Sequence, residues 1–352
     1  GEHAEEMAEA NGRGDIRKIF KSVKSLSMRQ QRAPKNLTTN GKGKLLGSAA
    51  EVAQRWFTFL SKKFSPTDAE LCRPQLLPLQ TAGKGYLHEE EIIAGLKKMK
   101  NGKATGIDDI PAEIYKVCPV CKQALIKLLQ KIWKDEVVPI DFAQAKFVML
   151  FKNKGSHDDP TRYRCLGMLN HSYKVLTQCL LARLEKETDG FLSDWQAGFR
   201  SQRGCRDNIL ALRSICDDAI ENGEKVFITF IDYSAAFDSV SHRYLDKALA
   251  EAGASDKSRS ITRAIYITAS ARTTVNGIDG ETIYSEVFPV RRGVIQGDIT
   301  SPLFFIYTLE LILRTHDNVG GKGVDFGGKC VYTLGYVRRR RRSLRSQHRN
   351  GN

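Results

Sequence analysis

Apolar residues recur at helical spacing through much of the first two hundred positions. From Ser48 onward, Val52, Trp56 and Leu60 share one face of a helix, and the Ser48 hydroxyl is available to cap its first turn. Residues 1–44 lack this periodicity and are polar and basic, so we expect a poorly ordered linker there. The same spacing predicts further helices over 87–100, 111–115, 124–133, 173–186 and 207–220.

Two runs rich in β-branched and aromatic residues predict buried strands. One is KFVMLF (146–151), and the other is KVFITFID (225–232), which ends in a carboxylate. The stretch 271–290 predicts paired strands that turn at Asn276-Gly277 or Asp279-Gly280, because both dipeptides suit tight hairpins. Helices are predicted over 241–252 and from Ser301-Pro302 onward. This order of elements predicts an α+β fold.

The chain of 352 residues is strongly basic. Its 55 Lys and Arg against 40 Asp and Glu give a formal net charge of +15, and residues 13–44 and 337–352 are the most basic parts. Such an excess favours an acidic partner, above all nucleic acid. No apolar run reaches the roughly 20 residues of a membrane-spanning helix, and the acidic start is unlike a secretory signal. We therefore expect an intracellular protein with no membrane partner.

The eight cysteines are scattered, which predicts reduced thiols rather than a disulfide framework. Cys118 and Cys121 form the one close pair in the sequence. A zinc site needs about four nitrogen or sulfur ligands, and no second CxxC or CxxH accompanies this pair. The expected structure is a helix start with Pro119 in its first turn and two buried thiols, without zinc.

Candidate chemistry centres on Asp232, because an acid that closes a buried strand either caps a turn or binds a cation. Phe237 follows five residues later, and the segment RRGVIQGDITSP downstream contains Gln296 and Gly297. Together these stretches resemble the palm of the reverse transcriptase domain of non-LTR (LINE-type) retrotransposons, where a strand ends in Asp and a later loop has the pattern GxxQGxxxSPxLF. Segments 96–116, 151–169 and 195–209 also resemble that family, in the family's order.

The resemblance spans about residues 45–337 and implies a right-hand polymerase fold. It implies a helical N-terminal extension over 45–145, fingers over 146–224, a partial palm of the split β-α-β type over 225–337 and an Arg-rich tail over 338–352. The implied activity is RNA-directed DNA synthesis in the nucleus. An RNA template, a DNA primer and deoxynucleoside triphosphates are the implied partners.

In that family nucleotides are joined at two divalent ions about 4 Å apart, and Mg²⁺ suits the oxygen ligands. The resemblance makes Asp232 the catalytic, metal-binding carboxylate and the Tyr233 carbonyl a metal ligand. Phe237 matches the aromatic that closes on the sugar 2′ position, with plain core packing as its alternative, and Gln296 and Gly297 match positions that line the nucleotide. The basic residues that match, each alternatively a solvated surface charge, are Lys152, Lys154 and Arg164 for triphosphate and Lys100, Lys103, Arg200, Arg203 and Arg206 for the nucleic-acid backbone.

The chain departs from the family where the palm's second carboxylate pair is expected. The family motif is roughly LGYADDAAL, whereas this chain has LGYVRRRRRSL from Leu334, and Cys165 replaces a usual Pro. Guanidinium groups only donate hydrogen bonds and cannot hold a metal ion, so we expect the chain as written to be inactive. A strand edge left unpaired at 331–336 would favour aggregation.

A frame slip near Val337 is one hypothesis for the arginines. Residues 337–344 can be encoded by GTA CGC CGA CGA CGC CGC TCT CTG, a choice that the genetic code permits but does not force, and one base later these codons read Tyr-Ala-Asp-Asp-Ala-Ala-Leu. The alternative is a nucleic-acid-binding arm or nuclear import signal. The hypotheses for function are thus a degenerate reverse transcriptase domain, a non-catalytic remnant that binds RNA or DNA, and a product with no role.

Overall fold

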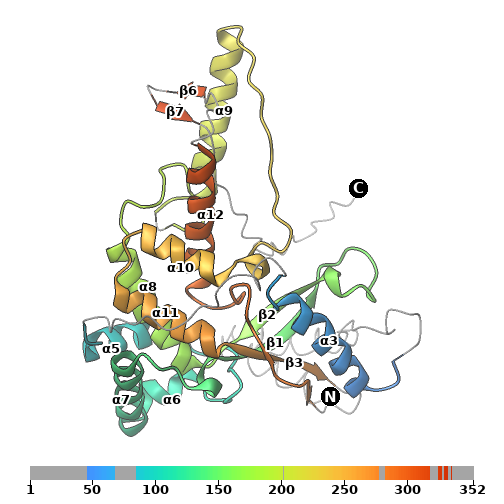
Figure 1. Ribbon diagram of the computed structural model, residues 1–352, viewed down its shortest axis with the longest axis vertical. Helices are drawn as coiled ribbons and strands as arrows, with labels where there is room; N and C mark the ends of the chain where they lie inside the picture. The colour runs from blue at the N-terminus through green and yellow to red at the C-terminus, as the bar shows by residue number, and fades with distance from the viewer. Residues whose placement is uncertain are drawn as a thin grey trace, which may run out of the picture.

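A mixed sheet joins segments that are far apart in the sequence. The computed structural model describes residues 46–67, 85–200, 202–276, 282–317, 324–326, 329–331 and 334. β1 (Gln144–Phe151) pairs antiparallel with β2 (Tyr163–Met168) and parallel with β3 (Ser270–Asn276), and β3 pairs antiparallel with β4 (Thr282–Tyr284) and β5 (Phe288–Pro289) (Figure 1). β6 (Val324–Phe326) and β7 (Lys329–Val331) form a separate antiparallel pair.

Helices pack around this sheet and against one another. α3 (Ala49–Lys63) contacts β3, β4 and β5, whereas the other helices lie to the left of the strands or above them in Figure 1. α5 contacts α6, α7 and α8, and α10 contacts α11 and α12. The bounds are α5 (Glu89–Lys98), α6 (Ala112–Val117), α7 (Pro119–Asp135), α8 (His171–Glu187), α9 (Cys205–Glu221), α10 (His242–Glu251), α11 (Asp256–Thr268) and α12 (Ser301–Asp317), with 3-10 turns η1 (Ile140–Ala143), η2 (Pro160–Arg162) and η3 (Phe237–Ser239).

Aromatic side chains lock α3 onto the sheet. Phe64 follows the last turn of α3, and its ring centroid lies 5.3 Å from that of Phe147 on β1 and 6.4 Å from that of Phe288 on β5. All three side chains are buried. Such aromatic pairs stabilise a core by about 0.5–1.5 kcal/mol beyond the area that they bury.

Most of the predicted elements are confirmed. The Ser48 side chain caps α3 by accepting a hydrogen bond from the Glu51 backbone N–H, 3.2 Å away. α5, α6, α7, α8, α9, α10 and α12 cover the helices expected from the apolar spacing, and β1 and the β3–β4 pair cover two of the expected strand regions. Helices and a mixed sheet together confirm the α+β class.

α11 and β2 were not expected from the pattern of apolar positions. The buried side chains of α11 include Lys257, Ser258 and Thr262, and the Lys257 ammonium lies 2.7 Å from a Glu136 carboxylate oxygen. Because part of the buried face is polar and satisfied by neighbours, apolar spacing gives only a weak signal there. β2 is short and has Gly167 in its interior, which also lowers its intrinsic strand preference.

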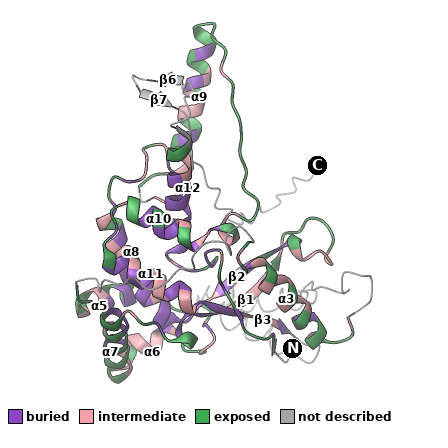
Figure 2. Ribbon diagram, viewed as in Figure 1, coloured by how far each residue is buried: buried purple, intermediate pink, exposed green. Residues whose placement is uncertain are grey.

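The expected strand over 225–232 is wrong. These residues run as an extended segment without strand pairing, beside α9 in Figure 1. Phe227 is 92% exposed and Phe230 82% exposed, and Figure 2 shows this segment in the exposed colour. A strand needs a neighbouring chain to satisfy its backbone groups. None of the described strands lies alongside this run, so its β-rich composition does not suffice.

Several other expectations fall on residues that the structure does not describe. They are the linker over 1–44, the two candidate hairpin dipeptides between β3 and β4 apart from Asn276, and the tail over 338–352. In the expected unpaired edge, Val331 itself pairs with Val324, and of the rest Leu334 alone is described. Among the described helices, none combines the length and the apolarity needed to span a membrane.

The exposed run can be tested by truncating its aromatic side chains. We expect the double variant Phe227→Ala, Phe230→Ala to keep its free energy of unfolding within about 1 kcal/mol of the original, because both rings are in water, and to scatter less light on concentration. Phe147→Ala is the matched control, since it removes a buried ring and costs roughly 3–5 kcal/mol. A loss in the double variant as large as in the control would show that the run is packed.

Acid sensitivity should follow from the ion pairs that join α10 to α11. Burial alone would raise the pKa of Asp246, but hydrogen bonds from Arg263 and Arg259 hold it below 3.8. The stability that these bonds supply is therefore present above that pH and is lost as the pH falls through the depressed folded-state pKa. We expect Asp246→Asn to cost about 2–4 kcal/mol at pH 7 and to flatten the acid limb of a denaturation profile.

The control for this prediction is Asp217→Asn. Asp217 lies 3.7 Å from Arg213, and its side chain is 61% exposed. An exposed pair of this kind contributes little, so the variant should retain the original acid limb. Equal effects of the two substitutions would contradict the assignment to Asp246.

Candidate functional site

The loop after β5 closes over the turn η3 through its backbone. The N–H groups of Gly293 and Val294 donate to the carbonyls of Val240 and Phe237, each at 2.8 Å. Gly293 has a φ of +85°, and a Cβ there would lie 2.8 Å from the Asp238 carbonyl oxygen. Glycine is therefore required at this position, and the contact fixes where Phe237 projects.

Phe237 packs among aromatic rings. Its ring stacks on Phe305 of α12, with centroids 5.1 Å apart and an interplanar angle of 15°, and meets Phe199 edge-on at 6.0 Å. The side chain remains partly exposed. The arrangement supports the packing role directly, and contact with a sugar stays a prediction.

Gln296 and Gly297 belong to the loop after β5 and pack against β2. The Gly167 N–H donates to the Gln296 carbonyl at 2.7 Å, and a Cβ on Gly297 would lie 2.3 Å from the Gly167 carbonyl oxygen. Both Gln296 and Gly297 are exposed, so the backbone of these two residues is accessible to a ligand. The structure thus brings the loop expected to line a nucleotide next to the strand expected to lie in the fingers.

The buried carboxylate of Asp298 stabilises this loop through hydrogen bonds. Asp298 accepts hydrogen bonds from the Tyr173 hydroxyl at 3.1 Å and the Thr300 hydroxyl at 2.9 Å. Burial raises the pKa of Asp298 above its usual value. Sequence analysis did not single out this residue, although its place directly after Gly297 in the quoted motif was a usable signal.

Basic side chains from β2 and the end of β1 gather beside η3. The Lys152 ammonium donates to the Thr161 carbonyl at 2.7 Å. Burial lowers the pKa of Lys152, as do the positive charges of Lys63 and Arg164, while Asp238 acts in the opposite direction. The Lys63 ammonium lies 2.6 Å from the Asp238 carboxylate. Lys152 and Arg164 therefore do share one region, and Lys63 and Asp238 are additions that the sequence analysis missed.

Lys154 lies in the bend after β1, exposed to solvent. No structural feature of the described residues sets it apart from a solvated surface charge. Its role toward a triphosphate stays a prediction.

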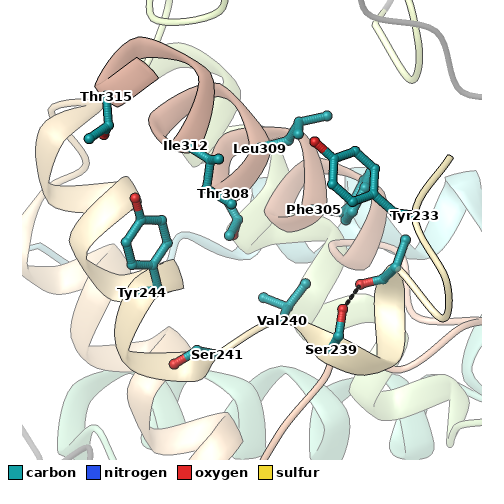
Figure 3. A pocket seen from close by; sticks show the side chains of 11 residues that line it. Tyr233, Ser239, Val240, Ser241, Tyr244, Phe305, Thr308, Leu309, Ile312 and Thr315 are labelled. Carbon is teal, nitrogen blue, oxygen red and sulfur yellow. Dashed lines mark hydrogen bonds between the residues drawn. The ribbon is translucent and has the colours of Figure 1, made fainter. Parts of the chain in front are cut away.

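Asp232 and Tyr233 lie on the extended segment that leads into η3. Asp232 is exposed. Tyr233 lines a pocket of about 390 Å³ between this segment, the start of α10 and the outer face of α12 (Figure 3). The other lining residues are Ala236, Ser239, Val240, Ser241, Tyr244, Phe305, Thr308, Leu309, Ile312 and Thr315.

The donor set around Asp232 does not fit two metal ions. Within the described part of the chain, no three His, Cys, Asp or Glu side chains come close enough to share a metal ion. One exposed carboxylate and one neighbouring carbonyl leave a pair of Mg²⁺ ions without most of the oxygen ligands they need. The described residues thus provide no complete site for these ions.

The residues expected to contact nucleic acid divide into two groups. Lys100, Lys103 and Arg206 are exposed. The Arg200 guanidinium instead donates to the Ser193 carbonyl at 2.7 Å, and that of Arg203 lies 2.7 Å from the Asp194 carboxylate. Arg200 and Arg203 thus hold their own loop together, and an added role toward a phosphate backbone stays a prediction.

The cysteine pair begins α7 as expected, with Pro119 in the first turn and the Cys118 sulfur accepting from the Cys121 N–H at 3.4 Å. The expectation of two buried thiols is wrong, because both side chains are partly exposed. A side chain that caps a helix lies at its N-terminal end, where it is accessible to water. The cysteines shown to be free thiols are Cys118, Cys121, Cys165, Cys179, Cys205 and Cys216.

Known proteins share this sequence pattern. The family described as "Reverse transcriptase (RNA-dependent DNA polymerase)" matches residues 151–327, half of the chain. The RNA-directed DNA polymerase from mobile element jockey of Drosophila melanogaster is 24% identical over 307 residues, 81% of this chain and 32% of that protein. The Pol polyprotein of the type-1 element R2 of Popillia japonica is 26% identical over 201 residues, 57% of this chain and 27% of that protein.

A third relative, the Pol polyprotein of the type-2 element R2DM of Drosophila melanogaster, is 33% identical over 159 residues, 44% of this chain and 14% of that protein. The chain therefore spans less than a third of the length of each of these relatives. The family match covers the loop over 293–297, the turn η3 and the basic residues Lys152 and Arg164. The protein belongs to the reverse transcriptase family, as a domain of the kind found in non-LTR (LINE-type) retrotransposons.

Proposed function

We propose that this chain is the nucleotide-binding part of an RNA-directed DNA polymerase of a non-LTR retrotransposon, acting on an RNA template and a DNA primer in the nucleus. One observation carries the proposal. The glycine loop over 293–297 contacts both β2 and η3, so Gln296, Phe237 and the cations Lys152 and Arg164 belong to one connected surface. In this proposal residues 146–224 act as fingers and 225–337 as palm.

The described residues supply binding and orientation. Lys152 and Arg164 offer positive charge to the oxygens of a triphosphate, for which cationic donors are well suited. The exposed Gln296–Gly297 backbone can approach a base pair closely because glycine has no side chain. Phe237, held by its stack on Phe305, would exclude a 2′ hydroxyl and so favour deoxynucleotides. The family generally uses divalent ions, which supply charge stabilisation at the transferred phosphorus when they are bound.

The same observations also favour a second function, a remnant that binds RNA without copying it. Lys100, Lys103 and Arg206 are exposed and positively charged, whereas the carboxylates for two ions do not assemble among the described residues. The expected inactivity rests on the arginines at 338–342, which lie outside the described residues. Binding and synthesis therefore need separate measurements.

Nucleotide binding is the first measurement. We expect Lys152→Gln and Arg164→Gln each to weaken binding of deoxyguanosine triphosphate about tenfold in low salt, because each removes one charge beside the phosphates. Titration calorimetry of the whole chain gives the dissociation constants. Lys127→Gln, an exposed lysine on α7, is the matched control and should stay within about twofold. Unchanged affinity in both site variants would overturn the nucleotide site.

Primer extension on an RNA template is the second measurement. We expect no extension by the chain as written in Mg²⁺, together with RNA binding whose dissociation constant rises steeply between about 50 and 200 mM salt. Replacing residues 337–344 by the second-frame sequence with two Asp is the variant that tests the arginines. Extension by the unaltered chain that Asp232→Asn abolishes would show that the missing carboxylates are supplied by other residues, and that the expected inactivity is wrong.

A further inference from the structure

An ion pair joins the N-terminal helix α3 to the turn that bears Phe237. The Lys63 ammonium and the Asp238 carboxylate are 2.6 Å apart, with 22% and 18% of the side chains exposed. Lys63 lies in the last turn of α3, and Asp238 is the residue after Phe237 in η3. The pair is partly shielded from water, so each charge has a substantial effect on its neighbours.

Further positive charges surround this pair. Lys152 is influenced by the charges of Lys63, Arg164, Arg162 and Asp238 together. Arg162 already pairs with Asp159, at 3.0 Å. Asp238 therefore pairs with Lys63 and also acts on Lys152, whose charge is in turn affected by Arg164. The Asp238 carboxylate thus offsets part of the positive charge in this region.

The ion pair is not required to hold either element in place. The turn η3 is fixed by hydrogen bonds from the Gly293 and Val294 N–H groups, and α3 is fixed by the packing of Phe64. The Arg291 N–H also donates to the Phe64 carbonyl at 3.0 Å. Lys63 can therefore leave Asp238 without loosening α3 or η3.

Other buried or half-buried ion pairs of the structure differ in this respect. Lys257 pairs with Glu136 at the end of α7, and Asp246 of α10 pairs with Arg259 and Arg263 of α11. Their carboxylates hold helices together. Asp238 instead lies one residue from Phe237, and its charge acts on Lys152, which is proposed to contact phosphate.

We propose that Asp238 is an internal counter-ion that holds Lys63 until a nucleoside triphosphate arrives, and that Lys63 then moves from the carboxylate to a phosphate oxygen. The inference rests on the proposed nucleotide site and adds Lys63 to its ligands. Asp238 acts as a competitor of the triphosphate. Its removal strengthens binding, and the removal of Lys63 weakens it.

The experiment measures the affinity of the full chain for deoxyguanosine triphosphate and for inorganic tripolyphosphate, each with Mg²⁺, at low salt. We expect Asp238→Asn to bind about five to ten times more tightly than the original and Lys63→Met about five to ten times more weakly. The double variant should bind more weakly than Asp238→Asn, because the tighter binding of Asp238→Asn depends on Lys63 being free to contact phosphate. Lys62→Met, on the exposed side of the same helix turn, is the matched control and should stay within about twofold.

A thermal unfolding scan of each variant separates this role from a merely structural one. Asp238→Asn should be no more stable than the original while it binds more tightly, a combination that a loss of structure cannot produce. If it does not fold, Asp238→Ser replaces it. The opposite shifts should shrink in about 0.5 M salt, since both are electrostatic.

Three results would overturn the inference. One is weaker or unchanged triphosphate binding in Asp238→Asn, and another is a shift seen for a short single-stranded RNA but not for either triphosphate. The third is no binding of either triphosphate to the original chain, which would overturn the proposed nucleotide site as well. If the original binds and Lys152→Gln weakens it, but the two ion-pair variants do not diverge, the nucleotide site stands and the counter-ion role falls.

Discussion

A contact between two backbones, with no side chain between them, holds the candidate site together. A Cβ at Gly297 would lie 2.3 Å from the Gly167 carbonyl oxygen, and one at Gly293 would lie 2.8 Å from the Asp238 carbonyl oxygen. The loop therefore takes its position from β2 at one end and from η3 at the other. A shift of either element would carry the loop with it, because side-chain rotation cannot absorb the movement at a glycine.

Like charges gather beside this contact. Burial and neighbouring cations both lower the pKa of Lys152. An anion that enters relieves the repulsion, so part of its affinity comes from the protein's own charge distribution. In the proposed nucleotide site this charge distribution would favour a highly charged ligand over a neutral one of the same shape.

Local patterns in the sequence predicted the helices well, because apolar spacing and caps are local signals. Ser48 could be identified as a cap from its place before an apolar run, whereas α11 escaped notice because Lys257 and Ser258 are among its buried residues. The prediction of a strand over 225–232 was wrong for the opposite reason. The composition of this run is typical of a strand, but none of the described strands pairs with it. Pairing is a tertiary property, and a single stretch of sequence does not contain it.

The candidate site shows the same division between local and distant signals. The motif around Gln296 and Gly297 led to the loop, and the family pattern led to Lys152 and Arg164. Lys63 had no comparable signal, because its partner Asp238 belongs to a different region of the sequence and the two meet only through the fold. Asp298 could have been found, since it directly follows Gly297 in the same motif.

The parallel pairing of β1 with β3 also constrains how the chain reaches its structure. Gln144 and Ser270 lie side by side although 126 residues separate them, so the central sheet has a high contact order. Formation of such a sheet is slow, because a long loop must be closed before the contact is gained. During synthesis β1 and β2 emerge well before β3, and their exposed strand edge must wait in a partly folded intermediate. A chaperone that covers this edge, or fast translation between the codons of β2 and β3, would therefore raise the yield of folded protein.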